Sequence, residues 1–147
     1  IPICMNHKSS FRAASNPVIF LLAMLFILSS CSKKMSFSTS AVVPAAEGSV
    51  KIKKDKNENY AVNLTVRHLS APDRLMEPKN LYVVWANTNE NGVRNMGQLK
   101  SGHGLFSKAL SGNLKTVTTF EPVNFFITAE KDASIPYPEG QVVLTTK

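Results

Sequence analysis

Leu81-Tyr82-Val83-Val84-Trp85-Ala86 is a continuous apolar run rich in β-branched and aromatic residues. Such residues are enriched in strands, and a strand that is apolar on both faces is covered on both sides. The turn residues Asn89-Glu90-Asn91-Gly92 follow directly. Asn-Gly favours a tight hairpin because both residues tolerate positive φ. We therefore expect 81–86 to be a central strand, paired through this turn with a second strand over 93–100.

Upstream of this strand, apolar and polar residues alternate over 60–67 and again over 50–54. A period of two is typical of strands with one face in the core and the other in water. The polar residues 55–59 between the two runs indicate a turn, so we expect a hairpin. One face of 60–67 carries Tyr60, Val62, Leu64 and Val66, and the other carries Asn63, Thr65 and Arg67.

Downstream, prolines and glycines divide the chain into short segments. We expect strands over 115–120, 124–130 and 141–146, a short segment over 105–110, and proline-containing loops over 70–79 and 135–140. No helix of useful length is expected after the first thirty residues. About seven short strands with proline and glycine turns predict an all-β domain, a small antiparallel β-sandwich of the immunoglobulin-like kind. A partly open barrel is the alternative.

Residues 18–28 form an uncharged apolar run of eleven residues. A membrane-spanning helix needs roughly 20 such residues, whereas the hydrophobic region of a secretory signal has about 7–15. Lys8 and Arg12 supply the positive region that precedes it, and Met5 is the expected start of translation. The sequence therefore predicts a signal peptide over 1–30.

The end of this run, Leu28-Ser29-Ser30-Cys31, resembles the lipobox of bacterial lipoprotein signal peptides. The resemblance implies a thioether from Cys31 to diacylglycerol, cleavage before Cys31, and acylation of the new amine with a fatty acid such as palmitate. Two acyl chains anchor a protein stably. A buried hydrophobic helix with a chance cysteine is the alternative. We expect a cell-envelope protein whose partner is membrane lipid, through acylated Cys31.

Residues 32–47 are rich in serine, threonine and alanine and show no sustained periodicity. We therefore expect the signal peptide over 1–30, lipidated Cys31 and a flexible tether over 31–48, and the sandwich over 49–147. Ser32 is not the aspartate that retains some lipoproteins at the inner membrane. This favours the outer membrane over the inner membrane, with the domain facing the periplasm.

The chain carries a formal charge of +7, and residues 31–147 retain fifteen basic and ten acidic residues. A basic segment near anionic lipid is attracted by about 1 kcal/mol per cation. Nucleic acid is not an expected partner, because the basic residues are not interleaved with stacking aromatics. The cysteines are Cys4 and Cys31, so the domain is expected to lack disulfides and cysteine-ligated metal. Six cations gather near its start: Lys33, Lys34, Lys51, Lys53, Lys54 and Lys56.

Motifs of known catalytic or nucleotide-binding chemistry do not occur, so we expect no catalytic residues, cofactor or metal site. His68 is expected on the apolar face at the end of the 60–67 strand, and His103 at a loop tip. The carboxylate pairs 55/58 and 73/77 lack the glycine and regular spacing of a calcium loop and are read as surface charge.

Tyr82-Val83-Val84-Trp85-Ala86, followed after a turn by Met96-Gly97-Gln98-Leu99, resembles the YxVWxx…xLGxL signature of the outer domain of anti-sigma-K-type regulators. Residues 126–130, a polar turn, Pro136 and residues 140–143 resemble its later FxVTxEPxGGSxxPTGxxV part. The resemblance covers roughly 50–147. It implies a sandwich in the envelope whose structural core includes Tyr82, Val84, Trp85, Gly97, Leu99 and Glu130.

That family joins its outer domain to a membrane helix and a cytoplasmic sigma-binding domain, and here a lipobox stands in their place. Sigma-factor binding is therefore not expected. The leading hypothesis is a lipid-anchored, non-enzymatic interaction or sensing module that docks on a membrane protein. The second is a structural or glycan-binding lipoprotein that uses Tyr60, Tyr82 or Tyr137. The third is a small hydrolase centred on His68 or His103.

Overall fold

The structure, a computed structural model, describes residues 32–103 and 109–147. The chain divides into two compact units at residues 30 and 31, and the second is described here. Within the described residues, none of the helices has the length and apolar character needed to cross a membrane. The strands are β1 (Ser32–Ser36), β2 (Glu47–Lys54), β3 (Tyr60–Leu69), β4 (Leu81–Thr88), β5 (Gly92–Gln98), β6 (Lys100–His103), β7 (Leu110–Thr118), β8 (Pro122–Glu130) and β9 (Val142–Thr145), with a short 3-10 helix, η2 (Pro72–Arg74).

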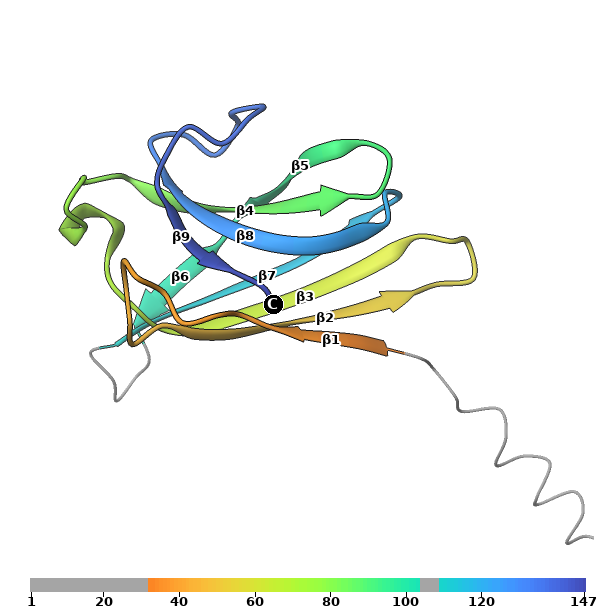
Figure 1. The fold of residues 1–147 in the computed structure, drawn as a ribbon, viewed down its shortest axis with the longest axis horizontal. Coiled ribbons are helices and arrows are strands. Elements are labelled where there is room, and N and C mark those ends of the chain that lie inside the picture. Colours follow the sequence, from red (N-terminus) through yellow and green to blue (C-terminus); the bar gives the residue numbers. More distant parts are fainter. Residues whose placement is uncertain (1–31, 104–108) are drawn as a thin grey trace, which may run out of the picture. The chain divides into compact units, whose positions relative to one another are not determined.

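Two antiparallel sheets face each other across the core (Figure 1). The five-stranded sheet has the order β1-β2-β3-β7-β6, and the four-stranded sheet has the order β5-β4-β8-β9. The inward residues of both sheets form one hydrophobic core. The predicted all-β sandwich is confirmed.

Strand β4 has the central, doubly covered position that its sequence predicts. It pairs with β5 on one side and β8 on the other. Its inward residues Tyr82, Val84 and Ala86 belong to the core between the sheets. Val83 and Trp85 point to the opposite side and are also fully buried. Residues 131–141, which connect β8 to β9, fold back over that side of the sheet (Figure 1).

The β2–β3 hairpin is also confirmed, with Val50 opposite Leu64 and Ile52 opposite Val62 in the core. Asp55 orders the turn between the strands. Its Oδ1 accepts hydrogen bonds from the backbone amides of Asn57, at 2.8 Å, and of Asn59, at 2.9 Å.

The flexible tether expected over 31–48 is wrong for the described part of that segment. Residues 32–36 form β1, which pairs along its whole length with β2, and Met35 packs against the core. Phe37 and Val43 are buried, and Ser40 Oγ donates a hydrogen bond to the carbonyl of Val143 at 2.5 Å. The serine-rich composition of this segment gives no periodic signal for the few buried residues that attach it to the core. Residues 32–36 join the sheet through backbone pairing with β2, and amino-acid composition does not predict such pairing.

The strand expected over 93–100 divides between the two sheets. β5 belongs to the four-stranded sheet and β6 to the five-stranded sheet, and Leu99 lies buried at the crossing. Gly97, at a φ of 118°, lies at the β-bulge that precedes the crossing. On the facing strand, a Cβ at Gly112 would lie 2.6 Å from Leu99 Cδ2, so glycine there makes room for Leu99.

The opposite edges of the sheets are joined as well. Phe37 bridges to Thr146, and the amide of Ser38 donates to the carbonyl of Thr145 at 2.8 Å. The two sheets are thus held together both by the β5–β6 crossing and by the segment that follows β1.

Two further expectations differ from the structure. His68 does not continue the apolar face of β3, because a bulge between Val66 and Leu69 shifts the register. His68 takes a φ of 57° and is exposed, and Leu69 is buried in its place. Strand β7 begins at Leu110, five residues before the expected 115. Of the segment expected over 105–110, residues 105–108 lie outside the described residues.

Candidate functional site

The lipobox residues Leu28, Ser29, Ser30 and Cys31 lie outside the described residues. The six residues expected in the structural core gather around β4 and its neighbours: Tyr82, Val84, Trp85, Gly97, Leu99 and Glu130. All are buried except Gly97, which is half-buried, so their positions are structural. In residues 32–103 and 109–147, no cluster of three or more histidine, cysteine or carboxylate side chains is placed to hold a metal ion.

A buried chain of hydrogen bonds lies on the outer side of the four-stranded sheet. Trp85 Nε1 donates to Thr128 Oγ1 at 2.8 Å, and this hydroxyl donates to Glu130 Oε1 at 2.6 Å. Glu130 Oε1 also accepts the backbone amides of Glu139, at 3.1 Å, and Gly140, at 3.0 Å. The carboxylate therefore holds residues 131–141 over the tryptophan, and Glu130 acts in folding.

Tyr82 is not available to a ligand. Its ring is 1% exposed, and its hydroxyl donates to the carbonyl of Ser70 at 2.8 Å. Burial, with a smaller contribution from the negative charge of Asp73, raises the pKa of Tyr82 to about 12. Of the tyrosines proposed for glycan contact, Tyr60 is half-buried and Tyr137 is 70% exposed.

The outward side of the five-stranded sheet is a broad exposed surface, here called the basic face. It arises because alternate residues of each strand point away from the core. Register places Ser32, Lys53, Ala61 and Val117 in one row across the strands. The charged residues of the basic face are Lys34, Glu47, Lys51, Lys53, Arg67, Lys100 and Lys115.

The charge of the domain is concentrated on this face. The described residues 32–103 and 109–147 contain fourteen basic and ten acidic residues, and six of the basic and one of the acidic lie on the basic face. The other described residues, eight basic and nine acidic, nearly cancel. The basic face therefore carries +5, and the net positive charge of the described residues lies on one side of one sheet.

Like charges meet directly on the basic face. Lys34 lies opposite Lys51, and the same row continues through Asn63 to Lys115. Like charges directly opposite each other on neighbouring strands are destabilising. The ion pair that the structure shows, Lys54 Nζ to Glu58 Oε1 at 3.2 Å, lies at the β2–β3 turn. The arrangement costs stability, so folding alone does not explain it.

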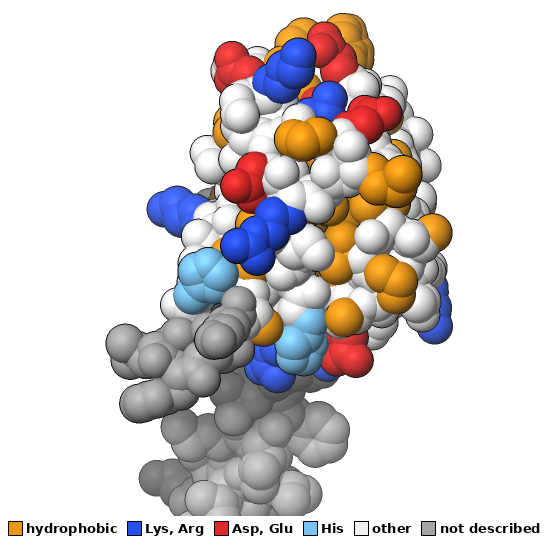
Figure 2. Space-filling model, turned by 90° about the vertical axis from the view of Figure 1, so that its left-hand side faces the viewer, with side chains coloured by type: hydrophobic (Ala, Val, Ile, Leu, Met, Phe, Trp, Pro, Cys, Tyr) orange, Lys and Arg blue, Asp and Glu red, His pale blue; other side chains and the backbone are white. Residues whose placement is uncertain are grey.

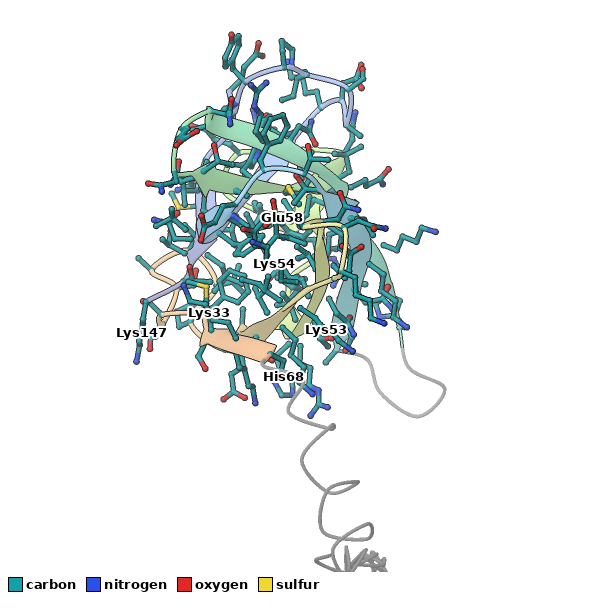
Figure 3. All side chains as sticks on the ribbon, turned by 90° about the vertical axis from the view of Figure 1, so that its right-hand side faces the viewer. Lys33, Lys53, Lys54, Glu58, His68 and Lys147 are labelled. Atoms are coloured by element: carbon teal, nitrogen blue, oxygen red, sulfur yellow. The ribbon has the colours of Figure 1, made fainter. Side chains whose placement is uncertain are left out.

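The basic face has two shallow depressions. One, of about 450 Å³, is lined by Lys34, Lys51 and Arg67 together with Glu47. The other, of about 440 Å³, has Ala61 and the 63% exposed Val117 between Lys53 and Lys115. Figure 3 shows Lys53 and His68 on the side of the five-stranded sheet that faces away from the four-stranded sheet. Lysines thus surround a small apolar centre.

A smaller hollow of about 220 Å³ lies at the hairpin end of the sandwich. Tyr60 and Phe120 line it, both half-buried, with Asn89, Asn91 and Glu121 beside them. Each ring has a cation over it, at 5.5 Å from Lys54 Nζ for Tyr60 and at 4.7 Å from Arg94 Cζ for Phe120.

The other end of the sandwich differs from the basic face. Figure 2 shows acidic and basic side chains interspersed there, with histidine at the lower edge. His103 lines a depression of about 450 Å³ with Asp73 and Arg74. Charges of both signs at this end give it no single electrostatic preference.

Comparison of the chain with protein-family models, curated proteins and solved structures finds no match. The basic face is also the feature that reasoning from sequence missed. Alternation places Asn63, Thr65 and Arg67 on the wet side of β3, but the register between strands decides which lysines join them.

Proposed function

We propose that the protein is a lipid-anchored cell-envelope protein whose β-sandwich is a non-catalytic interaction module. One observation carries this proposal. Ser32, the residue directly after the cysteine of the lipobox-like sequence, is already paired with Lys53 in the sandwich. An acylated Cys31 would therefore hold the folded domain against the membrane surface with no intervening linker.

The exposed basic face supports an interaction role. It concentrates the net charge of the domain and keeps lysines opposite each other at a cost in stability. A surface with clustered charge of one sign attracts and orients a partner of the opposite charge. The resemblance to the outer domain of anti-sigma-K-type regulators also fits an envelope module. We propose no sigma-factor binding, and we place the domain in the periplasm, with the outer membrane favoured.

Crosslinking in native membranes tests this role. A tagged wild-type protein is compared with Cys31→Ala and with the matched variant Ser32→Ala, which leaves the cysteine in place. We expect one set of membrane crosslinks, shared by the wild type and Ser32→Ala and lost in Cys31→Ala. Identical crosslinks in all three proteins would contradict a lipid-held module.

The hollow at Tyr60 and Phe120 favours glycan binding as a second candidate function. Partly exposed aromatic rings beside amide and carboxylate side chains provide stacking and hydrogen bonding together, as small-molecule sites do. Binding to isolated cell-wall glycan should fall in Tyr60→Ala and Phe120→Ala and persist in Tyr137→Ala. Equal binding by all three variants would exclude this hollow as the site.

A further inference from the structure

We propose that the basic face lies directly on the headgroups of an anionic bilayer, so that the domain is held flat against the lipid. This inference rests on the proposed envelope location and specifies which surface meets the membrane. It concerns the outward side of β1, β2, β3, β7 and β6.

Charge complementarity selects this partner. The basic face carries the net positive charge of the described residues, and their other basic and acidic side chains nearly cancel. A negatively charged surface therefore attracts one side of the domain and leaves the other sides without net attraction. The result is an orienting force as well as a binding force.

The spacing of the cations fits an extended flat surface. Lys34, Lys51 and Lys115 lie in one row that crosses β1, β2, β3 and β7. At about 4.8 Å per strand, the row is about 14 Å long. Lys53 is the next outward residue after Lys51 on β2. Arg67 on β3 and Lys100 on β6 extend the face further. Because the cations share one face, they can meet neighbouring headgroups at once.

The remaining features of the face also suit a lipid surface. Val117 is 63% exposed beside Ala61, and lysines flank both. An apolar centre with long cationic side chains around it is suited to the headgroup layer, where Lys and Arg keep their charges in the polar region. No aromatic side chain occurs at the outward positions that the structure describes on β1, β2, β3, β6 and β7, which disfavours single-stranded nucleic acid as the occupant.

The place of Ser32 in the sheet fits the same orientation. Ser32, the next residue, lies opposite Lys53 on the basic face. A lipid on Cys31 would therefore enter the membrane beside one corner of this face. Rotation about that corner brings the whole face down to the headgroups.

A chemical footprint tests the orientation. The full chain is extracted in detergent and reconstituted into vesicles of phosphatidylcholine alone, or of phosphatidylcholine with phosphatidylglycerol. Exposed amines are labelled with a membrane-impermeant reagent, and each lysine is quantified by peptide mass spectrometry. We expect Lys51, Lys53 and Lys115 to label at least about five-fold more slowly on the anionic vesicles, the factor that follows from the attraction per cation. Lys131, in the β8–β9 loop, should label equally on both.

A double variant, Lys51→Glu with Lys115→Glu, should lose the protection at Lys53. A matched variant, Lys131→Glu with Lys147→Glu, should retain it. Added salt should remove the protection by screening. Equal labelling of Lys53 on both kinds of vesicle would overturn the proposal.

The same digest tests the anchor separately, because the mass of the N-terminal peptide reports the lipid on Cys31. A lipidated Cys31 with an unprotected face would refute the orientation alone. An unlipidated Cys31 with a protected face would refute the anchor and support the orientation.

Discussion

Replacing Glu130 by alanine should destabilise the domain strongly. Its carboxylate is 2% exposed and accepts three hydrogen bonds at one oxygen, from the Thr128 hydroxyl and the amides of Glu139 and Gly140. Hydrogen bonds to a charged group contribute about 1.5–3 kcal/mol each. The two amides lie near the surface and can turn to water, whereas the Thr128 hydroxyl is buried. We therefore expect a loss of about 3–5 kcal/mol in the free energy of unfolding.

Urea unfolding of the detergent-solubilised protein measures this loss. The chain has one tryptophan, Trp85, which the loop over 131–141 covers, so its fluorescence reports on the loop as well as on unfolding. Glu130→Gln keeps the shape and an acceptor oxygen and should cost about 1–2 kcal/mol. Glu121→Ala removes an exposed carboxylate and should change stability by less than about 0.5 kcal/mol.

The emission of the folded variant gives a second readout. Loss of the hydrogen bonds to residues 139 and 140 should loosen the loop and admit water to Trp85, so native Glu130→Ala should emit at longer wavelength than the wild type. The reasoning is refuted if Glu130→Ala unfolds within about 1 kcal/mol of the wild type and its native emission is unchanged.

Three further predictions concern packing, charge and pH. Gly112→Ala places a Cβ 2.6 Å from Leu99 Cδ2 and should cost about 1–3 kcal/mol in a urea titration, and a neutral effect would contradict the tight crossing. Lys51→Gln relieves the repulsion from Lys34 and should stabilise by about 0.2–1 kcal/mol at low salt and less at high salt, whereas destabilisation at low salt would argue against it. Burial raises the pKa of Tyr82 from 10.0 to about 12, so its contribution to stability is complete below pH 10 and is lost towards pH 12. Tyr82→Phe should weaken that alkaline loss, and an identical pH profile would exclude Tyr82 as its source.

The parts of the fold that depend on local pattern could be predicted from the sequence. The doubly apolar run of β4 and the alternation of β2 and β3 specify their burial directly, and the structure confirms both. β1 could not be predicted in this way, because most of its side chains are exposed and its place depends on backbone pairing with β2. The crossing at Leu99 depends on the absence of a side chain at Gly112, which is distant in sequence.

The basic face illustrates the same limit at the functional level. The number of lysines is visible in the sequence, but their grouping depends on the register of five strands. Lys33 and Lys34 are adjacent in the chain, yet Lys33 lies opposite inward-facing Ile52 and Lys34 opposite outward-facing Lys51. Lys115 joins the same row from a distant part of the chain.

The chemical state of Cys31 in protein extracted from native membranes decides whether the domain is lipid-anchored. Intact-mass measurement and sequencing of the N-terminal peptide would determine it. The account predicts a chain that begins at Cys31 and carries diacylglycerol on its sulfur, and an uncleaved, unlipidated chain in Cys31→Ala. A wild-type chain that keeps residues 5–30, or that begins elsewhere with an unmodified Cys31, would contradict it.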